Sequence, residues 1–412
     1  MKPLEPVNTE PAKADSLAAN IAPANLPAVA VPGLYVHFPF CFHKCDYCDF
    51  YSVVGRGVDE MEAYVDRLLA EATFWTSGTG PALRPQTVFF GGGTPSLLPA
   101  RTMRRLIEGL AGRFDLGDAR EWTVEANPAT IDAAYLGMLR DLGVNRLSLG
   151  AQSFDESELR MLDRQHRPEE VAQTLQAARE AGLVRLSLDL IFGICGQTIE
   201  SWQRTLRSAL ALGTEHLSCY GLTYEPGTPL WTRRQAMQVR PVAEETELQM
   251  LHLTRRILTE AGLAPYEISN YARSGAECAH NLLYWNGGNY IGLGPSAASH
   301  VEGWRWTNCR SLQRWDRAVA AGQLAADEVE HLSPLRRAGE LAMLQLRLAR
   351  GVDFEDFAAR TGQEARRLFA QALARMSQLG MIACDEQGFR LTESGIDKAD
   401  TVAAEFLWDA SA

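Results

Sequence analysis

The sequence has few of the features that mark secreted, membrane-spanning or nucleic-acid-binding proteins. It contains only eight cysteines in 412 residues, which does not amount to a disulfide scaffold and suits a reducing cytoplasm. No run reaches the ~18–20 apolar residues that a membrane span requires. The net charge of −11 argues against an electrostatic grip on nucleic acid. Because the N-terminus has Lys2 but no apolar segment, we expect no secretion signal and a cytoplasmic protein.

The first 32 residues lack arginine and are poor in large apolar side chains. They are rich in alanine and proline, with scattered charges. Such a stretch cannot bury enough apolar surface to offset the entropy lost on ordering. We therefore expect residues 1–32 to form a disordered extension without an organelle-targeting role.

From Gly33 onward, short apolar runs alternate with longer helical patterns. The strands are expected at Leu34–Phe38, Thr87–Phe90, Trp122–Glu125, Arg146–Leu149, Arg185–Ile191 and Leu217–Leu222, and the helices at about 59–76, 100–113, 131–142, 168–181, 199–212 and 242–261. Six strand–helix units predict parallel strands with right-handed crossovers. The strands read as near-continuous apolar runs, as expected when both faces are covered. Since a full TIM barrel has eight units, we predict an α/β fold with a partial (β/α)6 TIM-like barrel over residues 33–265.

The C-terminal part of the sequence, residues 335–412, looks like a separate module. Helical patterns at 336–349, 353–360 and 364–379 precede two short apolar segments at 381–384 and 388–391. Helices followed by a two-stranded wing predict a winged-helix-like α+β domain. The acidic composition favours packing or partner docking over DNA binding for this module. Residues 266–334, between the barrel and the module, are expected to form a loop region.

Three cysteines follow the first expected strand at a C-x3-C-x2-C spacing. Cys41, Cys45 and Cys48 are soft ligands that can converge on one iron–sulfur cluster or one thiophilic metal. A closed [4Fe–4S] cluster normally takes four cysteines. Three therefore suggest one iron left open, as catalytic zinc sites leave a position for substrate. A zinc knuckle is the alternative, but the second pair of ligands that it usually requires is not evident.

With their flanking residues, these cysteines resemble the radical S-adenosylmethionine (radical SAM) superfamily. The segments His37-Phe38-Pro39-Phe40 and Asp49-Phe50-Tyr51-Ser52 narrow the resemblance to the oxygen-independent coproporphyrinogen III oxidase-like family and to its haem chaperone branch. The resemblance covers the chain from about Gly33 to its C-terminus. It implies that SAM chelates the open iron through its amino and carboxylate groups, and that the reduced cluster cleaves SAM to a 5′-deoxyadenosyl radical.

Further motif residues follow the C-terminal ends of the expected strands, where parallel barrels carry their active sites. The glycines at 91–93 let a backbone approach a ligand closely, and no P-loop lysine follows them. Asp189 interrupts an apolar strand, so it accepts from a ligand hydroxyl or forms half of a structural ion pair. Glu125 presents the same choice, and Arg164 suits a carboxylate. The resemblance implies that SAM is bound by Tyr35, Tyr47, Gly92, Gly93, Thr94, Glu125, Gln152, Arg164, Asp189, Thr223 and Ala298.

A second motif lies beyond the expected barrel. Residues His280–Trp285 match the H-N-x-x-Y-W signature of the haem chaperone branch. His280 is a candidate ligand of haem iron, with Tyr284 and Trp285 as flat apolar partners for a porphyrin. Alternatively, His280 is a satisfied histidine packed on core aromatic side chains. Cys278 is a second candidate for the axial ligand.

Two departures separate the chain from the true oxidases of the resembled family. Their further cysteine, two positions after the third cluster ligand, is Phe50 here, and residues 1–32 do not resemble their N-terminal segment. Both argue against decarboxylation of coproporphyrinogen III to protoporphyrinogen IX.

Three functions compete: a haem chaperone that passes haem to an acceptor protein, a radical SAM enzyme acting on a porphyrin, and a cluster-bearing interaction protein. The resemblance is also compatible with a flavodoxin- or ferredoxin-type electron donor and with peripheral membrane contact.

Overall fold

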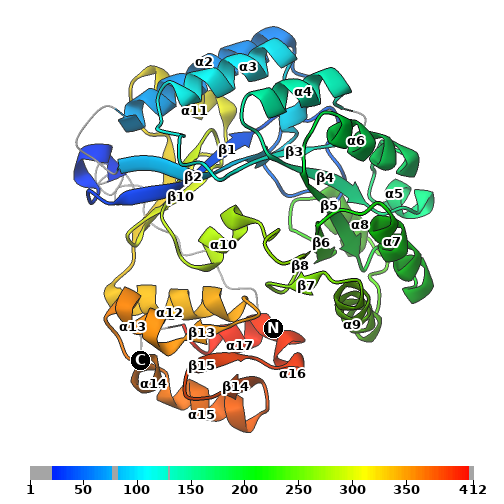
Figure 1. Cartoon of the computed structure of the whole chain (residues 1–412), viewed down its shortest axis with the longest axis vertical. Coiled ribbons are helices and arrows are strands. Elements are labelled where there is room, and N and C mark those ends of the chain that lie inside the picture. The colour runs from blue at the N-terminus through cyan, green and yellow to red at the C-terminus, as the bar shows by residue number, and fades with distance from the viewer. Residues whose placement is uncertain (1–20, 77–81, 129, 408–412) are drawn as a thin grey trace.

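The structure, a computed structural model, describes residues 21–76, 82–128 and 130–407. It consists of a curved sheet with helices along its convex side and a C-terminal domain facing its concave side (Figure 1). The six predicted strands pair in parallel and in sequence order, which confirms the partial barrel. They are β1 (Ala30–Phe38), β2 (Ala82–Gly92), β3 (Glu121–Ala126), β4 (Arg146–Gln152), β5 (Arg185–Phe192) and β6 (His216–Gly221).

The six predicted helices of the barrel are also present on the convex side of the sheet (Figure 1). They are α2 (Val58–Thr76), α3 (Ala100–Ala111), α4 (Ala133–Asp141), α6 (Pro168–Glu180), α7 (Ile199–Ala211) and α9 (Glu244–Glu260). Short elements that the sequence did not predict are η2 (Pro23–Asn25), η3 (Pro95–Leu97), α5 (Glu156–Met161) and α8 (Pro229–Gln235). The short elements α5 and α8 follow β4 and β6, so they lie close to the C-terminal edge of the parallel strands.

The barrel strands alternate apolar and polar side chains, which corrects the expectation of near-continuous apolar runs. On β5, Leu186 and Leu188 are buried in the apolar core that the helices complete. Successive side chains of a strand point to opposite faces, so Ser187 and Asp189 belong to the concave face. The concave wall of the barrel therefore carries polar side chains that can bind a ligand.

The sheet continues beyond the six barrel strands on both sides, so the prediction of a loop region over residues 266–334 is wrong. Beside β1 it adds four strands, and beyond β6 it adds two. The added elements are β7 (Ala264–Pro265), β8 (Asn270–Ala272), α10 (Ala279–Trp285), β9 (Tyr290–Leu293), β10 (Ala298–Val301), β11 (Trp304–Asn308), α11 (Leu312–Ala320) and β12 (Ala326–His331). Most of these strands are too short to produce a clear periodic pattern in the sequence.

The expected disordered extension is wrong for residues 21–32. Ile21 and Val31 are fully buried, Leu26 is nearly so, and β1 begins at Ala30. These few apolar side chains join the core between the sheet and α2, although the average composition of the segment hides them. Residues 1–20 lie outside the described residues.

The C-terminal domain has its own apolar core, and the predicted helices and wing are present in it. A third strand, β13, pairs with β15 to complete the order β13-β15-β14. The elements are α12 (Pro334–Leu346), β13 (Val352–Asp353), α13 (Phe354–Thr361), α14 (Ala365–Leu368), α15 (Ala370–Gln378), β14 (Ile382–Cys384), β15 (Gly388–Leu391), α16 (Glu393–Ile396) and α17 (Ala399–Ala404).

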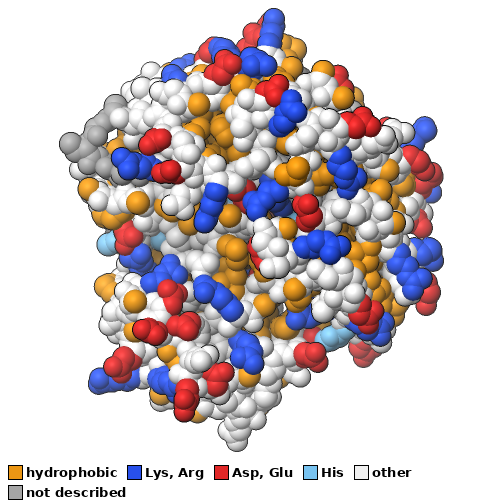
Figure 2. Space-filling model, in the orientation of Figure 1, with side chains coloured by type: hydrophobic (Ala, Val, Ile, Leu, Met, Phe, Trp, Pro, Cys, Tyr) orange, Lys and Arg blue, Asp and Glu red, His pale blue; other side chains and the backbone are white. Residues whose placement is uncertain are grey.

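Acidic and basic side chains are intermingled over the face of the molecule that Figure 2 shows. That face therefore presents no broad patch of one sign. Within the described ranges, every helix is too short or too polar to span a lipid bilayer.

Candidate functional site

The three cysteines of the motif lie on the loop that joins β1 to α2, at the C-terminal ends of the parallel strands. Cys45 is buried, whereas Cys41 and Cys48 are half-buried, and all three are free thiols. Burial raises the pKa of the Cys48 thiol to about 11. In the part of the chain that the structure describes, no three His, Cys, Asp or Glu side chains are placed to hold a single metal ion. In a cluster each cysteine binds a different iron, so its sulfurs stand further apart than around one ion.

The glycine run at the C-terminal end of β2 holds the cysteine loop in place. The Gly93 N–H donates to the Phe38 carbonyl at 2.6 Å, and the Thr94 N–H donates to the Phe40 carbonyl at 2.8 Å. A Cβ atom on Gly93 would lie 2.6 Å from both carbonyl oxygens and 3.1 Å from the Cys41 sulfur. Glycine is therefore needed here for close approach of two backbones and a cluster ligand.

A chain of hydrogen bonds connects two of the cysteines across the ends of β2 and β3. The Thr94 hydroxyl donates to the Cys41 sulfur at 3.7 Å, and the Asn127 amide donates to the Thr94 hydroxyl at 3.2 Å. Arg164 donates to the Asn127 amide oxygen at 2.8 Å and to the Cys45 sulfur at 3.7 Å. Hydrogen bonds to sulfur tune the potential of a bound cluster. Sequence reasoning missed Asn127, although a polar amide directly after a buried strand was an available signal.

Arg164 also carries an unused donor that points to a missing acceptor. Its guanidinium donates to the Gly150 carbonyl at 2.8 Å, while its Nε is buried without a partner among the described residues. Such an orphaned donor is uncommon in a native structure. Nearby Gln152 adopts a φ of 63°, a conformation that is concentrated at functional sites. The Arg164 guanidinium, with its unpartnered Nε–H, therefore fits an anion such as the SAM carboxylate.

Two half-buried carboxylates, Glu125 and Asp189, lie on the polar concave wall near Arg164. Ser148 donates to both oxygens of Asp189 at 3.2 and 3.1 Å, and the Gly92 N–H donates to Glu125 at 3.2 Å. Burial, and then the charge of Asp189, raise the pKa of Glu125 to about 8. Burial also raises the pKa of Asp189. Serine hydroxyls, rather than an ion pair, hold Asp189, so the alternative of a structural ion pair is not what the structure presents.

The remaining predicted SAM residues do not form one group. Tyr47 lies close enough to Cys45 and Arg164 for their charges to act on its pKa. The Tyr35 hydroxyl contacts His37 Nδ1 at 3.1 Å, on the inner wall rather than on the cysteine loop. Thr223 and Ala298 are exposed, on the segment after β6 and on β10, outside the hydrogen-bonded chain.

The second motif forms α10, which closes the opposite end of the barrel. His280 is 1% exposed, and its ring stacks on Phe89 with centroids 5.2 Å apart. Its Nδ1 bonds to the Thr87 hydroxyl at 2.9 Å, and its Nε2 bonds to the Tyr284 hydroxyl at 2.8 Å. Burial lowers its pKa to about 3, so the ring is neutral. With both nitrogens engaged, the structure favours the alternative of a packed histidine over that of a haem ligand.

A carboxylate from the barrel wall fixes the start of α10. Glu121, which is fully buried, accepts from the Ala279 and His280 N–H groups at 2.9 Å each. The Cys278 thiol donates to the same carboxylate at 3.4 Å and is itself fully buried. Cys278 is therefore as inaccessible to a haem as His280.

The other end of α10 contacts the C-terminal domain. The guanidinium carbon of Arg347 lies 4.9 Å from the centre of the Trp285 ring. Arg350 donates to the Asn286 side chain at 2.5 Å, and Arg360 donates to the Asn286 carbonyl. Thr87, which holds His280, is seven residues before Thr94, or about 20 Å along an extended chain. The motif is thus remote from the cysteines and joins the barrel to the C-terminal domain.

Comparison with known proteins agrees with this geometry. The profile of the radical SAM superfamily matches residues 35–209, and that of the HemN C-terminal domain matches residues 332–397. A protein of Bacillus subtilis named heme chaperone HemW is 33% identical over 90% of this chain and 98% of its own length. HemW of Synechocystis is 35% identical over 82% of each chain. A mitochondrial radical S-adenosyl methionine domain-containing protein 1 from cattle is 40% identical over 64% of this chain and 59% of its own.

Among solved structures, coproporphyrinogen III oxidase (HemN) from Escherichia coli, described as a radical SAM enzyme, shares the fold. Its TM-score is 0.80 at 24% identity, over 95% of this chain and 92% of that chain. Membership of the superfamily implies a [4Fe–4S] cluster and SAM, and the cysteine loop with its sulfur donors and the orphaned Arg164 Nε fit both. The chain belongs to the radical SAM superfamily and, within it, to the family of the HemW proteins.

Proposed function

We propose that this chain binds haem and passes it to an acceptor protein, as a haem chaperone. The observation that carries the proposal is its similarity to a protein named heme chaperone over 98% of that protein's length. The likeness to the Escherichia coli oxidase supports the shared architecture alone. Phe50, which is 66% exposed, stands where the oxidases of the resembled family have a further cysteine. This departure supports a haem chaperone over a coproporphyrinogen oxidase.

Cys41, Cys45 and Cys48 are the proposed ligands of the [4Fe–4S] cluster, with one iron left for SAM. When bound, the reduced cluster and SAM supply one-electron radical chemistry. We assign Arg164 Nε to the SAM carboxylate, because it is a buried donor in need of an acceptor.

The other assignments follow the predicted pocket. Glu125 is the proposed acceptor for the SAM amino group, and Asp189 is the proposed acceptor for its ribose hydroxyl groups. Gly92, Gly93 and Thr94 are proposed to line the SAM site. Tyr35, Tyr47, Gln152, Thr223 and Ala298 stay predictions. A cytoplasmic location and a flavodoxin- or ferredoxin-type electron donor belong to the same proposal, since thiolate ligands suit a reducing compartment.

The cluster assignment is tested by anaerobic reconstitution followed by iron and sulfide analysis. Replacing all three cysteines of the loop with alanine is expected to remove the bound iron. Cys384→Ala is the matched control, because Cys384 is an exposed free thiol in the C-terminal domain. Wild-type iron content in the triple variant would contradict the assignment.

The function is tested by titrating haem b into the reconstituted full chain and by incubating the reduced protein with SAM and coproporphyrinogen III. We expect saturable haem binding in the difference spectrum and no conversion of coproporphyrinogen. Absence of saturable binding would remove the chaperone proposal. Formation of protoporphyrinogen IX would replace it with the oxidase activity.

A further inference from the structure

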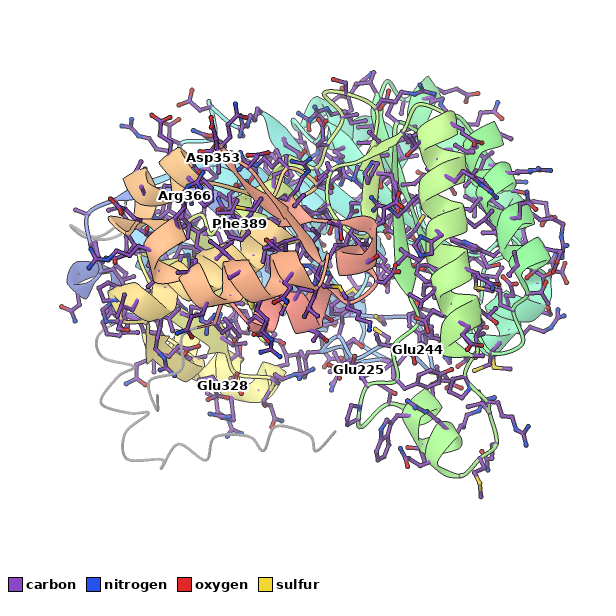
Figure 3. All side chains as sticks on the ribbon, turned by 90° about the horizontal axis from the view of Figure 1, so that it is seen from below. Glu225, Glu244, Glu328, Asp353, Arg366 and Phe389 are labelled. Carbon is purple, nitrogen blue, oxygen red and sulfur yellow. The ribbon has the colours of Figure 1, made fainter. Side chains whose placement is uncertain are left out.

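The chain between β6 and α9 contributes the short helix α8, which contacts the cysteine loop. Figure 3 labels Glu225, which precedes α8, and Glu244, at which α9 starts, and the chain between them projects beyond α9. Leu230, in the first turn of α8, is fully buried. It belongs to a small apolar cluster against which Tyr47 of the cysteine motif packs. The helix is therefore anchored beside the motif by its own apolar side chain.

The residue of the loop that α8 binds is Asp46, which follows Cys45 and precedes the third cysteine of the motif. The Leu230 N–H donates to the Asp46 carbonyl at 2.9 Å. The Arg233 guanidinium donates to the Asp46 carboxylate at 2.8 Å, and these side chains are only 34% and 22% exposed. The same helix thus binds both the backbone and the side chain of one residue between two proposed cluster ligands.

Arg233 also contacts the segment that leads to Arg164. A second nitrogen of its guanidinium lies 3.8 Å from the Met161 sulfur at the end of α5. Arg164, three positions further along the chain, donates to the Cys45 sulfur at 3.7 Å. Cys45 is therefore held at two points, by Arg164 at its sulfur and by α8 at the residue that follows it.

The other carboxylate next to a cysteine of the motif, Asp49, is bound less closely. Its side chain is 52% exposed and lies 3.6 Å from Arg310, which donates instead to the Asp49 carbonyl at 2.8 Å. Asp49 also follows the last cysteine, so it does not lie between two ligands. Asp46 is accordingly the more closely paired of these two carboxylates and the one placed between ligands.

The pairing of Asp46 bears on a bound cluster in two ways. Because only two residues separate Cys45 from Cys48, the backbone at Asp46 limits how far apart their sulfurs can lie. The reduction potential of a cluster also depends on the net charge around it, and a carboxylate beside a ligand disfavours the added electron. Arg233 offsets that negative charge, since a guanidinium forms a charge-assisted hydrogen bond with a carboxylate.

We propose that Asp46 is a positioning residue for the cluster. Its ion pair with Arg233 fixes the loop between Cys45 and Cys48 and balances the charge beside the cluster. The inference rests on the cluster assignment of the proposed function and adds to it a role for α8.

The first experiment probes the loop in the full chain without a cluster, by measuring how fast iodoacetamide alkylates Cys45, as read by mass spectrometry. Asp46→Asn and Arg233→Gln each remove one charge of the pair, and each should raise the rate about two- to fivefold, as expected for the loss of a partly exposed ion pair. Combining Asp46→Arg with Arg233→Asp restores a pair of reversed polarity, so the rate should return close to the wild-type value. The matched control is Arg104→Gln, which breaks an exposed ion pair with Glu108 on α3, on the convex side of the sheet.

The second experiment measures the reduction potential of the reconstituted cluster by a titration followed with electron paramagnetic resonance. Asp46→Asn leaves Arg233 unbalanced and should raise the potential, whereas Arg233→Gln leaves Asp46 unbalanced and should lower it. Each change is expected to alter the ratio of reduced to oxidised cluster by about three- to tenfold, and tenfold equals ~59 mV for one electron. A loosened loop without any effect of charge would move both potentials in the same direction.

The outcomes separate this proposal from the proposed function, and circular dichroism establishes that every variant is folded. Alkylation at the wild-type rate in both single variants would overturn the positioning of the loop. Potentials that shift in the same direction, or not at all, would overturn the balance of charge. Wild-type protein that binds no cluster would overturn the cluster assignment together with this proposal, whereas a failure to bind haem would overturn the chaperone function alone.

Discussion

Replacing Glu121 with glutamine tests whether this carboxylate holds α10 at the end of the barrel opposite the cysteine loop. Each carboxylate oxygen of Glu121 accepts one backbone N–H at the start of the helix. Glutamine has a single acceptor oxygen, and its amide N–H groups would face the second backbone donor. The substitution therefore keeps the shape of the side chain but leaves one buried N–H without a partner.

The expected loss follows from these contacts. An unsatisfied buried donor costs about 1–3 kcal/mol. Arg185, one third exposed and 3.5 Å from the carboxylate, adds ~1 kcal/mol at most. The buried Arg146 loses one of several neighbouring negative charges. We expect Glu121→Gln to lower the free energy of unfolding by about 2–4 kcal/mol, a large share of the ~5–15 kcal/mol typical of proteins.

Urea unfolding followed by circular dichroism measures this loss, and hydrogen exchange over residues 279–285 localises it. The control is Glu108→Gln, since Glu108 is 57% exposed and pairs with Arg104 at 3.5 Å on the same helix. That change is expected to cost about 0.5 kcal/mol or less. If both variants unfold at the same urea concentration and α10 exchanges at the wild-type rate, Glu121 does not hold the helix.

Three further substitutions examine the site and the signature. Arg164→Lys keeps the positive charge but loses the planar guanidinium. SAM should therefore bind about tenfold more weakly, while the iron content stays unchanged. A wild-type affinity for SAM, measured by calorimetry, would contradict the assignment of Arg164 to the SAM carboxylate. The pKa of Glu125 is about 8 in the folded protein, against an ordinary value of 4.5. Between these values the folded state keeps a proton that the unfolded chain has lost, so the free energy of unfolding should fall as pH rises from 5 to 8. The fall is at most ~1.4 kcal/mol per pH unit. Glu125→Gln should flatten that profile, and superimposable profiles would refute the reasoning. His280→Phe should cost about 1–3 kcal/mol of stability through its unpaired neighbours and leave the haem spectrum unchanged; an altered Soret band in folded protein would restore His280 as the ligand.

The parallel strands could be predicted because short apolar runs alternate with longer helical patterns along the chain, and single polar residues such as Ser187 and Asp189 do not hide these runs. β2 was predicted five residues too short at its start because Pro85 and the charged Arg84 interrupt the pattern before Thr87. The same reasoning failed for residues 21–32, where the three large apolar side chains that are buried, Ile21, Leu26 and Val31, are too far apart in the sequence to form a recognisable pattern.

The site was predictable only as far as its parts follow strands directly. The cysteines, Gly93 and Thr94 could be placed from the sequence because the C-terminal ends of parallel strands meet at one edge. The function of His280 could not, because its partner Thr87 is 193 positions away in the chain. Neighbouring aromatic residues suggested a porphyrin surface; in the structure Tyr284 bonds to His280, and Trp285 lies against Arg347 of the C-terminal domain.

The strand β2 gives the molecule a mechanical property. Thr87, in the middle of β2, bonds to His280, whose helix α10 contacts the arginines of the C-terminal domain. The chain just beyond the C-terminal end of β2 bonds to the cysteine loop. A fully extended strand is a stiff rod along its axis, since its backbone has no slack to pull out. A displacement of the C-terminal domain that is transmitted through α10, and not absorbed by bending of that helix, is therefore carried along β2 to the cysteine loop.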